Sequence, residues 1–337
     1  MENTHGSVAI GFRQGWGWLV LAALTVSTIG DEITLLTLMF RTAENAPSYA
    51  VPALLIAELL PGLIAAPWAG RLIDRRDAAR ILVAASVLQA GVIALIAHHP
   101  VLTLVGAACL SLLFTISSAA TFALIPLLAN ALGMTLARAN SLLEIVRSLG
   151  MLAGPVAGGV LVGWIGSRAA LLADAASFGL LALVVLASGL RRAPERGDVE
   201  ERTLFADYLP LLRNRRVMVV TGALSLEVFA TAIADVAFVF LVTVTLASGP
   251  TTFGVLTALW AGGMLIGAAM AEKVIGHRVG LAAFGTAAVM GATMLLIGLA
   301  PIGFAIVALA FILGGGANSI HNGVTSRFVR QTTISRT

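Results

Sequence analysis

Long apolar runs follow one another along this chain, and each is long enough to cross a lipid bilayer as a helix. A spanning helix needs roughly 20 apolar residues. Ten stretches come close to or exceed this length: residues 17–40, 50–69, 81–97, 101–129, 141–164, 169–190, 217–247, 252–271, 279–299 and 301–326. Only 11% of the residues are charged, against about a quarter in soluble proteins. The pattern predicts an all-α polytopic membrane protein with the lipid bilayer as its solvent.

The basic residues are sorted between alternate connections of these runs. If the N-terminus is cytoplasmic, 18 of the 21 Lys and Arg residues lie on the cytoplasmic side, Arg41 and Arg168 lie on the other side, and Arg147 lies within a span. Cytoplasmic connections carry such an excess of positive charge. Because the charges are sorted in this way, they do not indicate nucleic-acid binding. The richness in Ala, Gly and Leu favours a bacterial source, so we expect a multi-pass protein of the bacterial inner membrane with a cytoplasmic N-terminus.

One long polar connection, residues 191–216, divides the chain. Six predicted spans precede it in residues 1–190, and four follow it in residues 217–337. We therefore expect an N-terminal six-helix bundle, a cytoplasmic linker and a C-terminal bundle of four helices.

The two halves also carry a matching charge pattern after their second span. An acid, a base and a further base recur at an offset of 198 residues, as Asp74, Arg75 and Arg80 and as Glu272, Lys273 and Arg278. The recurrence at the same cytoplasmic turn predicts a parallel internal repeat, as in some transporter folds.

Two motifs stand out within this arrangement. The connection after the second span begins Gly70-Arg-Leu-Ile-Asp74-Arg75, and the fifth span contains Gly-Met-Leu-Ala-Gly-Pro-Val-Ala-Gly-Gly. With this topology, the chain resembles the major facilitator superfamily. The second motif fits that family's antiporter signature, GxxxGPxxGG, at Gly150, Gly154, Pro155, Gly158 and Gly159. The first fits its loop motif, except that Asp77, Ala78 and Ala79 stand where the family usually has a glycine and two basic residues.

Shorter phrases resemble the branch of macrolide-efflux and enterobactin-exporter proteins. They are Ile29-Gly-Asp31, Leu60-Pro-Gly62 and Ala139-Asn-Ser141. The resemblance implies a two-bundle fold of twelve spans, so we expect the C-terminal bundle here to lack the last two. It also implies a secondary active transporter that exports a small amphipathic compound, such as an antibiotic, a macrolide-like drug or a siderophore, in exchange for protons. Such an efflux antiporter would contribute to multidrug resistance.

The glycine motif has a physical interpretation of its own. Small residues allow helices in lipid to approach closely, and Gly150, Gly154 and Gly158 recur every fourth residue on one face. Pro155 removes a backbone donor and bends a helix. We expect this helix to seal against a partner from the other half, although ordinary packing of small residues is the alternative. The resemblance further implies that Asp74 braces an inner gate.

Several ionisable residues fall inside the predicted spans, where a charge is costly and commonly functional. They are Asp31, Glu32, Glu58, Glu144, Arg147, Asp174, Glu227 and Asp235. At 1.5 Å per residue, Asp31 lies about 21 Å from the inner edge of its span, Glu58 about 12 Å from the outer edge and Glu227 about 15 Å from the inner edge. Asp31 and Glu32 are adjacent and are expected to point in different directions. Asp174 and Asp235 lie nearer the outer face, where they could meet water.

The three mid-depth acids are candidates for proton coupling. A carboxyl group in an apolar medium favours its neutral form and can exchange a proton near neutral pH. Our hypothesis is that Asp31, Glu58 or Glu227 couples proton entry to export. The alternative is that each is a fixed hydrogen-bonding or cation-binding group.

Other polar or aromatic residues in the spans are candidates for a substrate cavity. Arg147 could contact a substrate or pair with Glu144 three residues before it. The remaining candidates are Trp260, Asn318, His321 and Asn322. The three polar residues among them could instead fill a gap between helices.

Enzyme chemistry is not indicated. The chain has no phosphate-binding loop, nucleophile triad or dinucleotide fingerprint. His98 and His99 are adjacent and do not converge, so no metal site or cofactor is expected. We expect a monomer whose partners are the bilayer, a small molecule and protons. The alternatives are a truncated, transport-inactive membrane protein, and an importer or sensor of the same fold.

Overall fold

The computed structural model describes residues 15–192, 215–275, 279–299 and 303–334, and in α7 to α10 it describes some residues by their backbone alone. Within these ranges the regular elements are all helical. They are α1 (Trp16–Asn45), α2 (Ala50–Arg75), α3 (Ala78–His98), the 3₁₀ helix η1 (Pro100–Leu102), α4 (Thr103–Ala131), α5 (Leu136–Ser188), α7 (Arg215–Phe240), the π-helix η2 (Leu241–Thr245), α8 (Pro250–Ile275), α9 (Val279–Leu299) and α10 (Phe304–Ile334).

Eight helices in the described part are long and apolar enough to cross a membrane. In lipid the backbone groups must bond within each segment, which favours long helices of this kind. The prediction of an all-α polytopic membrane protein is therefore confirmed, whereas the predicted count of ten spans is not. Part of the difference lies in α5, which covers two predicted spans. Another part lies in α7, where only residues 232–245 qualify, as a shorter apolar helix.

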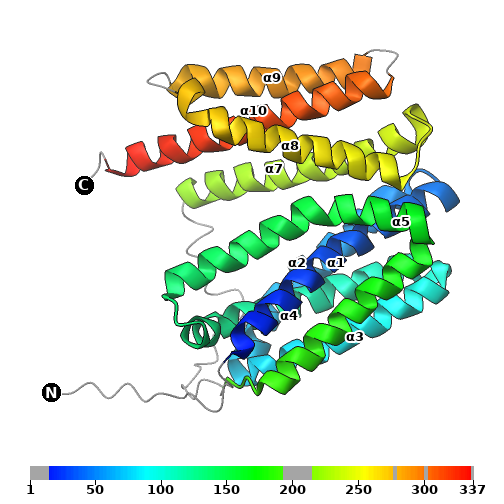
Figure 1. Ribbon diagram of the computed structural model, residues 1–337, viewed down its shortest axis with the longest axis vertical. Helices are drawn as coiled ribbons and strands as arrows, with labels where there is room; N and C mark the ends of the chain where they lie inside the picture. Colours follow the sequence, from blue (N-terminus) through cyan, green and yellow to red (C-terminus); the bar gives the residue numbers. More distant parts are fainter. Residues whose placement is uncertain (1–14, 193–214, 276–278, 300–302, 335–337) are drawn as a thin grey trace.

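The chain reverses direction inside α5. Gly166 has φ 81° and ψ 161°, a backbone conformation that side chains with a Cβ rarely adopt. It separates a first arm, residues 136–165, from a second arm, residues 167–188. Figure 1 shows the two arms turning back on each other. They correspond to the predicted spans 141–164 and 169–190.

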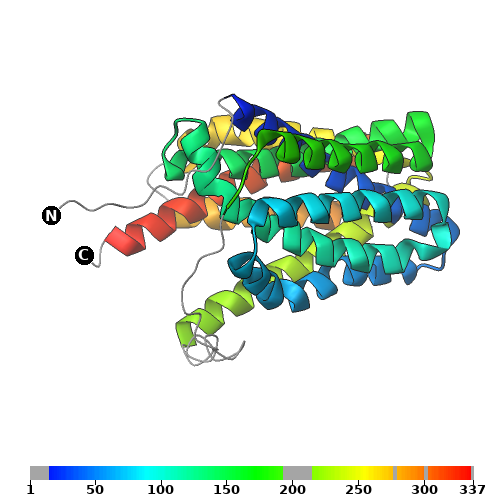
Figure 2. The ribbon, with the colours of Figure 1, turned by 90° about the horizontal axis from the view of Figure 1, so that it is seen from below.

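The helices form two groups, which Figures 1 and 2 show from two directions. In the first group α1 and α3 pack against α5, and α2 and α3 pack against α4. In the second group α10 packs against α8 and α9. α7 lies between this group and α1 and α2, and α5 meets α8 across the boundary. Residues 193–214 lie outside the described ranges, so the domain boundaries remain a prediction. The side chains of Glu272, Lys273 and Arg278 also lie outside the described part, and so does this half of the predicted repeat.

The described residues before the connection make six helical passes, and those after it form α7 to α10. The expectation of an incomplete second bundle fits this arrangement. Two ends of the molecule can be distinguished. We call the end where α2 ends at Arg75 and α7 begins at Arg215 the basic end, and the end where α8 begins at Pro250 the far end.

An apolar cluster joins the two groups at the far end. Phe253 of α8 stacks on Phe238 of α7, with ring centroids 3.9 Å apart, and meets the edge of Phe40 of α1 at 5.5 Å. Val51 and Leu54 of α2 belong to the same buried cluster. We call Phe40, Phe238 and Phe253 the far-end aromatic cluster. It closes this end of the boundary between the groups.

Candidate functional site

A cavity of about 680 Å³ lies where α1, α2, α4 and α7 face one another. Its volume is within the range of about 300–1,000 Å³ that holds drug-sized ligands. Four carboxylates line it, from Asp31, Glu32, Glu58 and Asp235. The other polar side chains of the wall are Thr34, Ser111 and Thr115, and the rest of the wall is apolar.

Helix packing sets the positions of these acids. The backbone N–H of Gly62 on α2 donates a hydrogen bond to Ser111 Oγ on α4, at 2.9 Å. A Cβ on Gly62 would lie 2.5 Å from Thr115 Oγ1 and 2.9 Å from the Ser111 carbonyl oxygen, so glycine permits this close approach. Glu58 lies one turn before Gly62 on α2, and this contact therefore fixes the depth at which Glu58 enters the cavity.

The cavity takes in both acids of the adjacent pair on α1. The expectation that Asp31 and Glu32 point apart holds for the helix geometry, but both line the same space. The same wall also includes Glu58 of α2 and Asp235 of α7. Glu32 is acted on electrostatically by two other groups, which are the carboxylate of Asp235 and the guanidinium of Arg147.

Asp235 was expected to lie near the outer face and to meet water, and the structure finds it exposed and in the wall of the cavity. It lines the cavity together with Ala232, one turn before it on α7. The signal in the sequence was a lone acid inside an apolar run. Its direction could not be read from the run, because α7 meets the first group only through tertiary packing. Glu227 also lies on α7, but its side chain is outside the described part of the chain.

Asp174 is also corrected, because it is buried rather than solvated. Its carboxyl group is 2% exposed and accepts hydrogen bonds from Thr34 Oγ1 at 2.6 Å and from Ser177 Oγ at 2.9 Å. Gly30 of α1 packs directly against it. Asp174 thus joins α1 to the second arm of α5, behind the wall that carries Asp31.

The predicted cavity candidates lie elsewhere. Arg147 and Glu144 are both exposed, and they form no ion pair in the described part of the chain. Trp260 packs against Phe311 of α10, with centroids 6.0 Å apart, inside the second group. None of these three residues lines the cavity.

The polar residues of α10 are also apart from the cavity. His321 Nδ1 lies 3.0 Å from Thr286 Oγ1 of α9. Asn318 is half-buried and Asn322 is exposed. Thr286 lines a second, largely apolar cavity of about 610 Å³ between α8, α9 and α10. Here the helix-packing alternative describes the positions of these residues better than substrate contact does.

The glycine motif divides its contacts between the two groups. Gly150, Gly154 and Gly158 face Thr28, Glu32 and Leu36, which are all on α1 of the same group. The next glycine, Gly159, faces the other group. A Cβ there would lie 2.5 Å from the carbonyl oxygen of Pro250 and 2.8 Å from Cα of Gly254, both on α8.

The expected seal against the other half therefore involves Gly159 rather than the stripe of three glycines. The three glycines serve packing within the first group, because α1 lies along that face of α5. Pro155 leaves the helix intact, since the backbone departs from helical angles within α5 only at Gly166.

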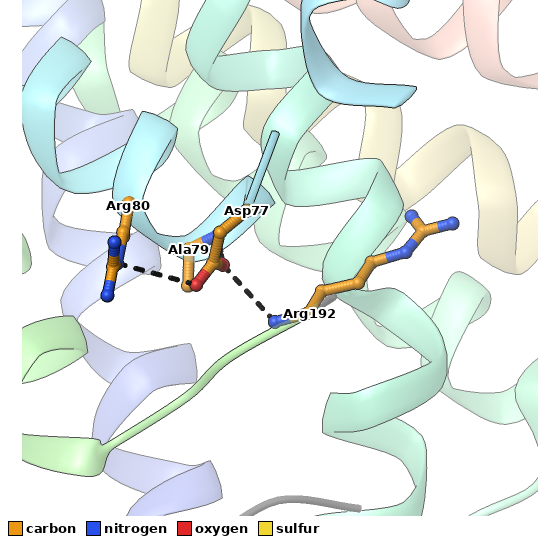
Figure 3. Close-up of polar contacts among 4 residues, drawn as sticks. All are labelled: Asp77, Ala79, Arg80 and Arg192. Atoms are coloured by element: carbon orange, nitrogen blue, oxygen red, sulfur yellow. Dashed lines mark hydrogen bonds and ion pairs between the residues drawn. The ribbon is translucent and has the colours of Figure 1, made fainter. Parts of the chain in front are cut away.

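At the basic end, Asp77 lies in the connection between α2 and α3 and makes several polar contacts. Its carboxylate accepts hydrogen bonds from the backbone N–H of Ala79, at 3.0 Å, and of Arg192, at 3.2 Å (Figure 3). It also lies 3.7 Å from Nε of Arg80. The Arg192 guanidinium donates to the carbonyl oxygen of Ala123 on α4, at 2.8 Å. Asp77 thus caps α3 and holds the chain after α5 against the first group.

The residues singled out from the loop motif make fewer described contacts. Gly70, Asp74 and Arg75 are exposed at the end of α2. Within the described part, Asp74 has no hydrogen bond or ion pair. Its role as a gate brace stays a prediction.

Comparison with known proteins agrees with this architecture. The sequence profile of the Major Facilitator Superfamily matches residues 17–333. The multidrug efflux pump Tap of Mycolicibacterium fortuitum is 28% identical over 230 residues, which cover 60% of this chain and 56% of the pump. The chain thus aligns with little more than half the length of this curated relative.

Solved structures share the fold at lower identity. The nucleoside transporter NupG superposes with a TM-score of 0.70 and 14% identity, over 94% of this chain and 82% of NupG. The D-xylose-proton symporter superposes with a TM-score of 0.54 and 14% identity, over 93% of this chain and 82% of the symporter. With a family profile that spans nearly the whole chain, and a helical fold shared with these transporters, the protein belongs to the Major Facilitator Superfamily.

Proposed function

We propose that the protein is a proton-coupled exporter of small amphipathic compounds. The observation that carries this proposal is the cavity of about 680 Å³, in whose wall Asp31 and Glu58 lie among apolar side chains. A ligand of drug size can be bound there, and a carboxylate in the same wall can take up or release a proton. One site can thus exchange the two species.

Alternating access is compatible with the contacts around the cavity. The far-end aromatic cluster closes one end of the boundary between the groups, and Gly159 and Gly254 bring α5 and α8 into backbone contact beside it. A rocking motion that parts this close contact would open the far end and close the basic end. Rocking of one bundle against the other around a central site is a general mode of transport.

The direction of transport rests on the relative and on charge. The pump Tap is a multidrug efflux pump, and we carry that activity over to this chain as a proposal. The basic end would face the cytoplasm of a bacterial inner membrane, because positive charge is retained there. Import is the second candidate, since the D-xylose-proton symporter has the same fold. We further propose that the protein acts as a monomer, because one chain contains the whole cavity.

Reconstitution into proteoliposomes with a trapped pH indicator tests these alternatives. Compounds to be added include erythromycin, tetracycline and a catecholate siderophore. An exchanger takes up the compound and releases protons, so the lumen becomes more alkaline. A symporter takes up both, so the lumen becomes more acidic. No change with any compound would favour the transport-inactive alternative and contradict the proposal.

The proton-coupling candidates are then replaced one at a time, by Asp31→Asn, Glu58→Gln and Glu227→Gln. At least one variant should lose compound-driven proton movement. Glu44→Gln is a matched control, because Glu44 is exposed near the end of α1 and outside the cavity. Unchanged coupling in all three variants would remove these residues from the mechanism.

A further inference from the structure

The charges around the cavity are all of one sign. Acids from α1, α2 and α7 line it, and no Lys, Arg or His is among its described lining residues. Arg147 acts on Glu32 but lies outside the wall. We infer that the cargo of this cavity is an organic cation with a large apolar surface, rather than an anion such as a deprotonated siderophore. This inference rests on the proposed function, since it specifies the substrate of the same site.

The carboxylates in the wall lack polar partners in the described part of the chain. In the described part of the chain, Asp31, Glu58 and Asp235 make no hydrogen bond or ion pair. Asp31 and Glu58 are half-buried and Asp235 is exposed, so their carboxylates are accessible from the cavity. Asp174 illustrates the contrast, because it lies just outside the same wall and takes hydrogen bonds from Thr34 and Ser177. A structural acid is satisfied here, whereas the acids of the cavity are left available to a ligand.

The remaining wall is suited to an apolar body. Leu35, Leu38, Leu55, Leu59 and Leu63 line it from α1 and α2, and Phe114 lines it from α4. Apolar contact stabilises a lipophilic ligand in proportion to the area removed from water. An aromatic face also attracts a cation.

The position of the charges adds a requirement on the cargo. The four acids come from α1, α2 and α7, so a cation between them is attracted by carboxylates on three helices. An anion in the same place would be repelled by each ionised carboxylate, and no basic side chain in the wall would compensate it. Charge sign is therefore the property by which this cavity discriminates between compounds of equal size.

A pair of ions with opposite charge and closely similar shape tests the inference directly. Tetraphenylphosphonium is a cation and tetraphenylborate is an anion, and both carry four phenyl groups. Binding of each to the purified protein in lipid nanodiscs is measured by equilibrium dialysis, with empty nanodiscs subtracted. We expect saturable binding of tetraphenylphosphonium at one site, at least tenfold stronger than that of tetraphenylborate.

Variants of the wall locate the site. Glu58→Gln and Asp235→Asn each keep the side-chain shape and remove a charge, so each should weaken tetraphenylphosphonium binding by roughly tenfold to a hundredfold. Glu44→Gln, outside the cavity, should leave the affinity unchanged. Thermal unfolding of every variant confirms that the protein is folded before binding is measured.

The outcomes separate this inference from the proposed function. Equal or stronger binding of tetraphenylborate, binding of neither ion, or full affinity in both wall variants would overturn the inference. Binding of the cation without compound-driven proton movement would support the charge preference and contradict the exporter. Proton-coupled transport of anionic compounds would support the exporter and contradict the charge preference.

Discussion

Gly159 is the position where a single methyl group should alter the contact between the two helix groups. In Gly159→Ala the new Cβ would lie 2.5 Å from the carbonyl oxygen of Pro250, 2.8 Å from Cα of Gly254 and 2.9 Å from its nitrogen. These are backbone atoms, which cannot move aside as a side-chain tip can. Ordinary contact begins at 3.4 Å, so α5 and α8 must separate by about 0.9 Å. Such overpacking costs about 1–3 kcal/mol, which changes an equilibrium by roughly 5- to 150-fold.

The assay compares the distance between the groups in a graded series of variants. Spin labels are placed at Val101 and Val244, which are exposed at the far end on opposite groups, after Cys109→Ser removes the natural thiol. Gly179→Ala is the control, because nothing lies within 4 Å of a Cβ there. Gly158→Ala should leave the distance between the groups unchanged and lower stability to an intermediate degree, since its nearest neighbour is the tip of a leucine side chain on α1 of the same group.

Pulsed electron-electron double resonance should show a larger population of long distances between the two labels in Gly159→Ala than in the control. Thermal unfolding should show lower stability in the same order. If Gly159→Ala gave the same distance distribution and stability as Gly179→Ala, the backbone contact between α5 and α8 would not hold the far end together. The rocking mechanism proposed above would then lose its far-end seal.

Three further substitutions test other contacts. Asp77→Ala removes the cap of α3 and a backbone hydrogen bond after α5, so it should lower stability by about 1–2 kcal/mol in thermal unfolding. Asp74→Ala removes an equal side chain and should cost less; an equal loss of stability in both variants would contradict the role of Asp77. Asp174→Ala leaves two buried hydroxyl groups without their acceptor and should cost about 1–3 kcal/mol; Asp174→Asn keeps one acceptor oxygen and should cost less, and equal costs would refute the network. Phe253→Ala empties the centre of the far-end aromatic cluster, so an impermeant maleimide added at the far end should label a cysteine at Leu38 faster; an unchanged rate would show that another barrier closes this end.

The spans could be predicted from the sequence because a membrane-crossing helix is largely a local property. Length and hydropathy identify it, and the limits of α3 and α9 fall within a few residues of the predicted runs. The division of α5 was also local, since Gly166 follows the fifth span and only glycine readily adopts its angles. The ten-span count is not confirmed, because part of α7 is described by its backbone alone and only residues 232–245 are found there, as a shorter apolar helix.

The cavity could be predicted only in part. The depth of a residue along a spanning helix follows from its number, and this depth identified Asp31 and Glu58 as candidates. The direction of a side chain depends on which helices surround it, and the sequence does not state those neighbours. For this reason Asp174 was assigned to water although it lies against Gly30, and Asp235 was named inside its span but not placed in the cavity that it lines. Trp260 was expected at the cavity because it is deep in its span, but its ring faces α10.

The division of the glycine motif between two partners has a mechanical consequence. Gly154 lies against Glu32 of α1, and Gly159, little more than one turn further along α5, lies against α8. These glycines leave no side chain between the helices, so α5 is in backbone or near-backbone contact with both. Close packing of this kind transmits displacement, because interiors are dense and deform little. A movement of α8 against α5 would therefore reach α1 at Glu32, beside Asp31 in the cavity wall. The seal at the far end and the acids of the cavity are thus connected through one helix, and that connection is what an exchanger needs to couple access with the binding of its ligands.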